Sequence, residues 1–224
     1  MNVETFWQAR AVALELLSLS FRYPTPELAD SIISGEWRAA CIELEQAGCF
    51  LLPEGFADVE LALDADGVAV KDRDAFVRIL RVEATRLFIG APEPAVSPFE
   101  GVWRAVDDGV QPLLFANPHS IDVMQFLKSC GMGQPEGANE PLDHVATELE
   151  FMQYLAMLEA GIASPAESSV GVEDFPGGTA AAAYEHFLES HPKIWLGRFA
   201  ASVEEQARLS FYRIAAQVLS AFIA

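Results

Sequence analysis

Apolar residues recur at three- and four-residue spacing along most of this chain, which is typical of helices that bury one face. The first such stretch predicts a helix over Glu4–Phe21. A second helix is predicted directly after it, because Thr25 suits a capping position and Pro26 suits the first helical position. Gly35 is placed to end that helix, since glycine readily adopts the left-handed conformation that closes helices.

The next segments are less uniform. A third helix is predicted over about Glu36–Ala47. Prolines and glycines interrupt Phe50–Val70, and only a short helix near Val59–Leu63 is predicted there. The apolar stripe returns over Asp72–Ile89, which predicts a helix that ends at Gly90.

Three prolines then change the pattern. Pro92, Pro94 and Pro98 predict an extended loop that runs to Trp103, because proline fixes its own φ and disfavours helix in the residue before it. A helix over Asn117–Gly131 is predicted next, since an Asn-Pro pair again offers a cap followed by proline.

The last third of the chain predicts three more helices, over Leu142–Ala160, Thr179–Ser190 and Ile194–Ile223. No segment shows the two-residue period of a strand. The sequence therefore predicts an all-α bundle of seven or more helices. We expect one domain over residues 1–224, with possible hinges near residues 91–103 and 131–140.

The composition narrows the choice of partner. The chain has 224 residues, and its 51% hydrophobic content supports a substantial core. It carries 33 acidic and 14 basic side chains, a net charge of -19 that repels nucleic acids and anionic membranes. The same charge favours a cationic partner, such as a peptide that carries paired arginines ahead of an apolar stretch.

The cysteines and the first residues of the chain bear on the cellular compartment of the protein. Cys41, Cys49 and Cys130 are odd in number and form no C-x-x-C motif, so neither a disulfide framework nor a thiolate metal site is indicated. The first residues lack the pattern of a signal peptide, and no apolar run reaches the length of a membrane span. We therefore expect a cytoplasmic protein.

The stretch Glu140–Met152 holds the best candidate chemistry. Pro141 suits a turn or the first turn of a helix, and Asp143 is suited to cap the N–H groups that follow. His144 and Glu148 are four residues apart, which places them on one face of the predicted helix.

The run EPLDHVATELEFMQYL resembles the signature of the TorD/DmsD family, whose pattern is roughly E-x-P-D-H-L-x-x-E-L-x-F-M. This chain departs from that pattern in the order Pro141-Leu142-Asp143 and in Val145, which replaces the usual leucine. Four other regions resemble the family in the right order. They are Leu19–Pro24, Arg81–Gly90, Pro98–Trp103, and a closing pattern that includes His186, His191, Trp195, Phe199 and Phe211-Tyr212.

The resemblance implies a cytoplasmic chaperone for molybdopterin oxidoreductases, related to nitrate reductase assembly proteins. Such a chaperone binds the apo catalytic subunit before its cofactor is inserted and, in many members, holds its twin-arginine signal peptide. The resemblance implies no chemistry and no cofactor of its own. It implies these contact positions for the partner: Pro141, Asp143, His144, Glu148, Pro98, Phe99, Glu100, Trp103 and Tyr23.

Physical chemistry gives a reason for these residue types. A twin-arginine peptide presents positive charge next to an apolar segment, and arginine pairs bidentately with carboxylates. Asp143, Glu148 and Glu100 are candidates for those carboxylates. Trp103 and Phe99 are candidates for an apolar floor.

Other interpretations stay open at this point. Asp143 is also a plausible helix cap alone, and Glu100 a solvated surface acid. A small metal-binding protein or enzyme built on His144 and Glu148 is an alternative, although a transition-metal site needs three or four ligands. A permanent structural subunit of a redox complex is another. The identity of the client enzyme and homo-oligomer formation stay undecided.

Overall fold

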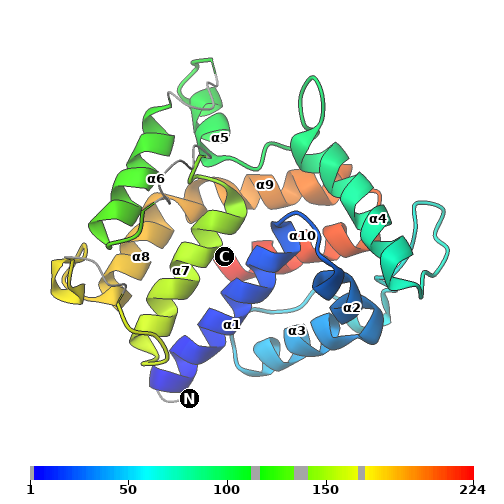
Figure 1. Cartoon of the computed structure of the whole chain (residues 1–224), viewed down its shortest axis with the longest axis horizontal. Helices are drawn as coiled ribbons and strands as arrows, with labels where there is room; N and C mark the ends of the chain where they lie inside the picture. The colour runs from blue at the N-terminus through cyan, green and yellow to red at the C-terminus, as the bar shows by residue number, and fades with distance from the viewer. Residues whose placement is uncertain (1–2, 112–116, 134–140, 166–169) are drawn as a thin grey trace. The chain divides into compact units, whose positions relative to one another are not determined.

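The computed structural model describes residues 3–111, 117–133, 141–165 and 170–224. These residues form ten α-helices and three short 3₁₀ or π segments, with only isolated β-bridges between extended residues (Figure 1). The predicted all-α class is confirmed. No helix in the described ranges combines the length and the apolar character needed to span a bilayer.

The chain divides into two compact units. Unit 1 comprises Met1–Glu15 and Phe99–Trp195, and unit 2 comprises Leu16–Pro98 and Leu196–Ala224. Two boundaries fall within α1 (Val3–Phe21) and α9 (Pro192–Gln206), and the third lies between Pro98 and Phe99. The single domain and the two hinges stay predictions, and most of 131–140 lies outside the described residues.

Unit 2 contains the first predicted helices with their predicted ends. Its elements are α2 (Pro26–Ser34), α3 (Glu36–Gln46), η1 (Phe56–Asp58), α4 (Arg73–Ala84), the π-helical η2 (Thr85–Ile89) and α10 (Ser210–Ile223). The Thr25 hydroxyl accepts a hydrogen bond from the Leu28 N–H at 3.4 Å, and Gly35 ends α2 with φ of 85°. The local capping signals were therefore sufficient to place these helices.

Aromatic side chains fill the core of unit 2. The rings of Phe21 and Phe199 meet edge to face at 5.4 Å, and Phe88 contacts both rings. Trp37 is fully buried, and its indole N–H donates to the Ser20 hydroxyl at 3.0 Å. Burial of each such side chain contributes roughly 1.5–3 kcal/mol, which holds the helices of this unit together.

Two predictions in unit 2 are wrong. The short helix near Val59–Leu63 is absent, and Leu63 instead pairs with Ala69 in an antiparallel bridge. The single helix over Ile194–Ile223 is two helices, because the chain breaks at Arg208 between α9 and α10. The Arg208 N–H donates to the buried Glu83 carboxylate at 2.6 Å. A residue distant in sequence thus supplies the hydrogen-bond acceptor that this N–H lacks where the helix is interrupted.

Unit 1 contains α5 (Glu100–Asp107), α6 (Pro118–Ser129), α7 (Val145–Glu159), η3 (Val172–Asp174) and α8 (Ala180–Ser190). Helices α7 and α8 lie side by side (Figure 1). The rings of Phe151 and Phe187 meet at 4.7 Å between them, and Phe126 of α6 contacts both rings. The predicted helices in this part of the chain are confirmed.

The proline-rich loop is shorter than predicted. The extended chain ends at Phe99, and Trp103 lies on α5 rather than in a loop. The prolines restrict only the residues near them, so a helix begins as soon as Pro98 has been passed.

Candidate functional site

Two of the predicted segments lie next to each other in unit 1. Phe99 and His144 form an antiparallel bridge, and the Glu100 N–H donates to the Asp143 carbonyl at 2.9 Å. The rings of Phe99 and His144 meet edge to face at 5.3 Å. The start of α5 and the start of α7 are therefore joined by backbone and by side chains.

His144, and not Asp143, caps α7. The Nδ1 atom of His144 accepts a hydrogen bond from the Ala146 N–H at 3.1 Å, and the helix begins at Val145. The prediction that Asp143 caps this helix is wrong. His144 is also only half buried while Glu148 is fully buried, so the two side chains are not equally accessible.

Asp143 instead caps the neighbouring helix. One oxygen of its carboxylate accepts hydrogen bonds from the Gly101 N–H at 2.8 Å and from the Ser120 hydroxyl at 2.6 Å. Gly101 lies in the first turn of α5, where helix N–H groups lack partners within the helix. Asp143 thus performs its expected capping role on a helix that begins 43 residues earlier in the chain.

The close approach at this point requires Gly101. A Cβ atom there would lie 2.4 Å from the Ser120 hydroxyl and 2.9 Å from the Asp143 carboxylate. The Asn117 side chain also donates to the Gly101 carbonyl at 2.5 Å. Gly101, Asn117 and Ser120 were not predicted as site residues. Asn117 was predicted only as the cap of α6, which it is.

Glu100 is a buried ion-pair partner and not a solvated acid. Its side chain is 0% exposed, and it accepts hydrogen bonds from Arg104 at 2.7 Å and from Nδ1 of His191 at 3.0 Å. Arg104 also donates to the Ser190 carbonyl at 3.2 Å. A carboxylate that is buried away from water needs hydrogen-bond donors or cations to replace its hydration. Here these donors connect α5 to the end of α8.

Glu148 lies beside this cluster. It is fully buried, and one of its oxygens accepts a hydrogen bond from the Trp195 indole N–H at 3.1 Å. Its other oxygen accepts no hydrogen bond from the described residues. Burial, together with the nearby charge of Glu100, raises the pKa of Glu148 well above its ordinary value of 4.5. The neutral form of Glu148 is therefore favoured over a wider pH range than for a glutamate in water.

Burial also raises the pKa of Asp143, although the hydrogen bonds from Ser120 and Gly101 oppose the shift. The three predicted contact acids, Glu100, Asp143 and Glu148, are thus at most 1% exposed and form one cluster with the partly exposed Arg104 and the buried His191. We call this set the acid cluster. Its hydrogen bonds hold the starts of α5 and α7 and the end of α8 in place.

Glu148→Gln tests the raised pKa of Glu148. The folded protein holds a proton that the unfolded chain releases above pH 4.5, so the contribution of Glu148 to stability is present below that pH. The contribution is lost as pH rises towards the raised pKa of the folded state. A glutamine at this position does not titrate, so we expect the free energy of unfolding of the variant to gain on that of the wild type as pH rises. Urea unfolding at several pH values measures this difference, and parallel pH profiles would contradict it.

The remaining candidates of unit 1 are more accessible. Phe99, Trp103, Pro141 and His144 are all partly exposed. We call these four residues the aromatic patch. Phe99 and His144 are in contact, and Trp103 follows Phe99 by one helical turn on α5. Their rings are partly open to solvent, and Phe99 and His144 directly adjoin Glu100 and Asp143 of the acid cluster in the sequence.

Two candidates lie in unit 2. Pro98 is buried and is the last residue of the unit before Phe99. Tyr23 is 54% exposed, and the Arg81 guanidinium lies 5.5 Å from the centre of its ring. Arg81 also donates to the Pro24 carbonyl at 2.9 Å, so Tyr23 sits in a local contact with α4.

In the described ranges, no group of three or more His, Cys, Asp or Glu side chains is arranged to hold a metal ion. His144 already uses Nδ1 as a helix cap, and Glu148 is buried against Trp195. The metal site predicted as an alternative on these two residues therefore has no third ligand among the residues described.

Comparison with known proteins agrees with this architecture. The model of the nitrate reductase delta subunit family matches residues 52–201, which is more than half of the chain. The chain belongs to this family, and its resemblance to the TorD/DmsD chaperones is confirmed.

Two relatives illustrate the similarity. A protein named Chaperone protein TorD from a classical strain of Vibrio cholerae is 26% identical over 154 residues, which cover 69% of this chain and 63% of that protein. Its counterpart from an El Tor strain is 28% identical over 137 residues, which cover 61% and 56%. The match thus spans less than two thirds of these relatives. No solved structure matches the chain.

Proposed function

We propose that this protein is a chaperone for a molybdopterin oxidoreductase. It binds the apo catalytic subunit in the cytoplasm before the cofactor is inserted and, where the subunit has one, its twin-arginine signal peptide. This binding delays export until the subunit has folded. Membership of the family and the similarity to proteins named TorD support the proposal. It requires no cofactor and no catalytic residue in the chaperone.

The observation that carries the proposal furthest is the bridge between Phe99 and His144. It brings the aromatic segment and the signature segment, which are far apart in sequence, to one place. Partly exposed aromatic rings provide large contact area at a low cost in conformational entropy, and such residues often dominate binding energy. The aromatic patch is therefore the proposed contact surface for the client.

The acid cluster has a positioning role in this proposal. Its carboxylates have buried partners, and a client arginine would have to displace those partners to reach Glu100 or Asp143. Such exchange is costly for buried charges. The sequence also predicted that client arginines pair directly with Glu100, Asp143 and Glu148. That pairing stays a prediction, and the burial of the three side chains disfavours it. The exposed acids that contribute to the charge of -19 are more accessible to a cationic client.

The first experiment is affinity capture from the native host during expression of respiratory molybdoenzymes, followed by binding measurements with the captured apo subunit. Trp103→Ala is expected to raise the dissociation constant by about tenfold to a hundredfold, because it removes the largest ring of the aromatic patch. Ile162→Ala, at another exposed apolar residue of unit 1, is the matched control and is expected to leave affinity unchanged.

Unfolding curves of both variants must match the wild type for the comparison to hold. Equal affinity of Trp103→Ala and wild type would contradict the assignment of the patch. Equal affinity for the apo and the mature enzyme would contradict the chaperone role and favour a permanent structural subunit.

A further inference from the structure

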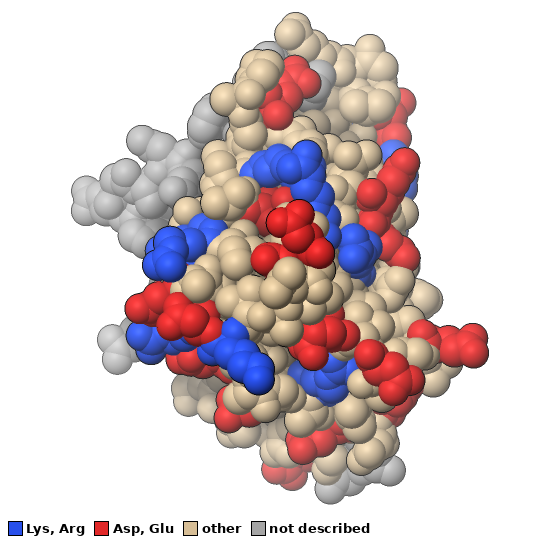
Figure 2. Space-filling model, turned by 90° about the vertical axis from the view of Figure 1, so that its right-hand side faces the viewer, with Lys and Arg blue, Asp and Glu red and all other residues tan. Residues whose placement is uncertain are grey.

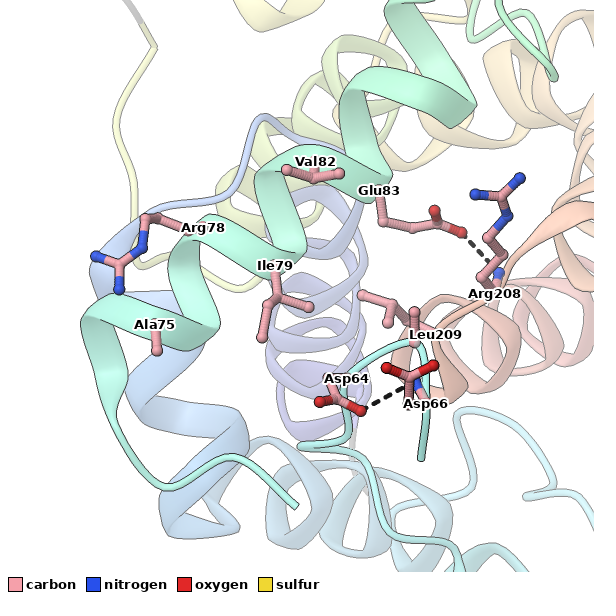
Figure 3. Close-up of a pocket in the computed structure, with 10 residues that line it drawn as sticks. Asp64, Asp66, Ala75, Arg78, Ile79, Val82, Glu83, Arg208 and Leu209 are labelled. Carbon is pink, nitrogen blue, oxygen red and sulfur yellow. Dashed lines mark hydrogen bonds between the residues drawn. The ribbon is translucent and has the colours of Figure 1, made fainter. Parts of the chain in front are cut away.

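Unit 2 contains an open groove that has no part in the site described above. It has a volume of about 480 Å³, in the range of roughly 300–1,000 Å³ that ligand pockets occupy. One wall is α4, the other is the turn at Asp64–Asp66, and Leu209 lies beside that turn (Figure 3). It is large enough for several side chains of a partner.

The α4 wall presents an apolar stripe. Ala75, Ile79 and Val82 follow one another at four- and three-residue spacing, which places them on one face of the helix. Val82 is 71% exposed, although the neighbouring face of α4 buries Phe76 and Leu80 in the core. A helix face of this kind is suited to an apolar segment of a partner.

The opposite wall is negatively charged. One oxygen of Asp64 accepts hydrogen bonds from the Asp66 N–H at 3.0 Å and the Val68 N–H at 2.8 Å, which fixes the turn. Within the described part of the chain, neither Asp64 nor Asp66 forms an ion pair. Two carboxylates therefore face the groove without cationic partners of their own.

The basic side chains of the groove do not cancel this charge. The guanidinium groups of Arg78 and Arg208 lie at opposite ends of the groove and point away from Asp64 and Asp66 (Figure 3). Glu83, the third acid, is occupied by the Arg86 guanidinium at 2.8 Å and by the Arg208 N–H. The face to which α4 belongs shows basic and acidic side chains interspersed, with no single basic patch (Figure 2).

We propose that this groove binds an apolar segment of a client polypeptide that carries a lysine or arginine beside its apolar residues. The apolar side chains lie against Ala75, Ile79 and Val82, and the cation lies against Asp64 and Asp66. This inference rests on the proposed function, because the segment that occupies the groove belongs to the client enzyme. It adds a second contact, in unit 2, to the aromatic patch of unit 1.

Two contacts with one client have a consequence for affinity. Once one segment is bound, the other is held at an effective concentration that reaches the millimolar range for short flexible linkers. A weak contact at the groove then strengthens the binding of the whole client. A variant that removes this contact keeps the contact at the aromatic patch.

The test uses the full chain and a fluorescein-labelled peptide, KKLALLALAG, as the probe, with the acidic peptide EELALLALAG as its counterpart. Val82→Glu is expected to weaken binding of the basic peptide by about tenfold or more. Val12→Glu, at an exposed valine of a helix in unit 1, is the matched control and is expected to bind like the wild type. Failure of the wild type to bind the peptide saturably, or equal binding by Val82→Glu, would overturn the proposal.

A charge reversal provides an independent test. Asp66→Lys is expected to lower the affinity for the basic peptide and to raise that for the acidic peptide, because the lysine reverses the charge at this position. Asp66 is exposed, and among the described residues none donates a hydrogen bond to its side chain, so the turn is expected to keep its shape. No change in this preference would overturn the proposed place of the cation.

The captured apo subunit separates the two proposals. If the groove variants bind it as the wild type does while Trp103→Ala does not, the groove inference fails and the chaperone function stands. If the wild type does not bind the apo subunit, the proposed function fails, whatever the peptide result.

Discussion

Replacing Glu100 by alanine is expected to lower the free energy of unfolding by about 3–5 kcal/mol, because it breaks a buried ion pair from one side. Arg104 and His191 would both lose their acceptor. His191 is 1% exposed, so water would not replace the carboxylate without opening the structure. Glu148 would lose the neighbouring charge that helps to raise its pKa.

Urea unfolding of the full chain measures the loss, and hydrogen exchange of α5 and α7 locates it in unit 1. Glu185→Ala is the control, since Glu185 is an exposed glutamate of α8 and its removal is expected to change stability by no more than about 0.5 kcal/mol. A loss below about 1 kcal/mol for Glu100→Ala would show that the acid cluster does not hold α5 in place.

Asp143→Ala is expected to have the next largest effect, a loss of about 3 kcal/mol, from the cap and from donors left buried without an acceptor. The Gly101 N–H and the Ser120 hydroxyl both donate to the same oxygen of Asp143. Without that oxygen the first turn of α5 loses its cap, and Trp103 on the same helix loses its fixed position. Binding of the apo client should therefore weaken in parallel with stability.

Asp143→Asn distinguishes the hydrogen bonds from the charge. Asparagine keeps an oxygen that is able to accept both hydrogen bonds, and the other oxygen of Asp143 accepts none from the described residues. We expect Asp143→Asn to retain most of the stability and of the client affinity. If the asparagine variant lost as much client affinity as the alanine variant while remaining folded, the negative charge itself would be the functional feature.

Local signals predicted those parts of the fold that depend on neighbouring residues. Thr25 and Asn117 cap the helices that follow them, as their sequence context indicated. Gly35 ends α2 for a reason contained in its own backbone, since φ there is 85°. The all-α class followed from the spacing of apolar residues, which each helix repeats many times.

Contacts between distant residues decided the rest. Aspartate is a common helix cap, so the sequence indicated that Asp143 would cap the helix that follows it. The sequence could not show that the Gly101 N–H, from the distant helix α5, would be its hydrogen-bond donor instead. The break at Arg208 depends on Glu83, and no proline or glycine marks it. Both interpretations of Glu100, as a contact for the partner and as a solvated acid, required an accessible side chain, and its actual partner His191 lies 91 residues away.

The long-range cap of α5 also bears on the order of events during synthesis. A ribosome synthesises α5 before Asp143, and later still come His191 and Trp195, which donate hydrogen bonds to Glu100 and Glu148. Until those residues emerge, the first turn of α5 has no acceptor for its N–H groups. A nascent chain that has not yet reached Trp195 therefore does not present the aromatic patch in its final form.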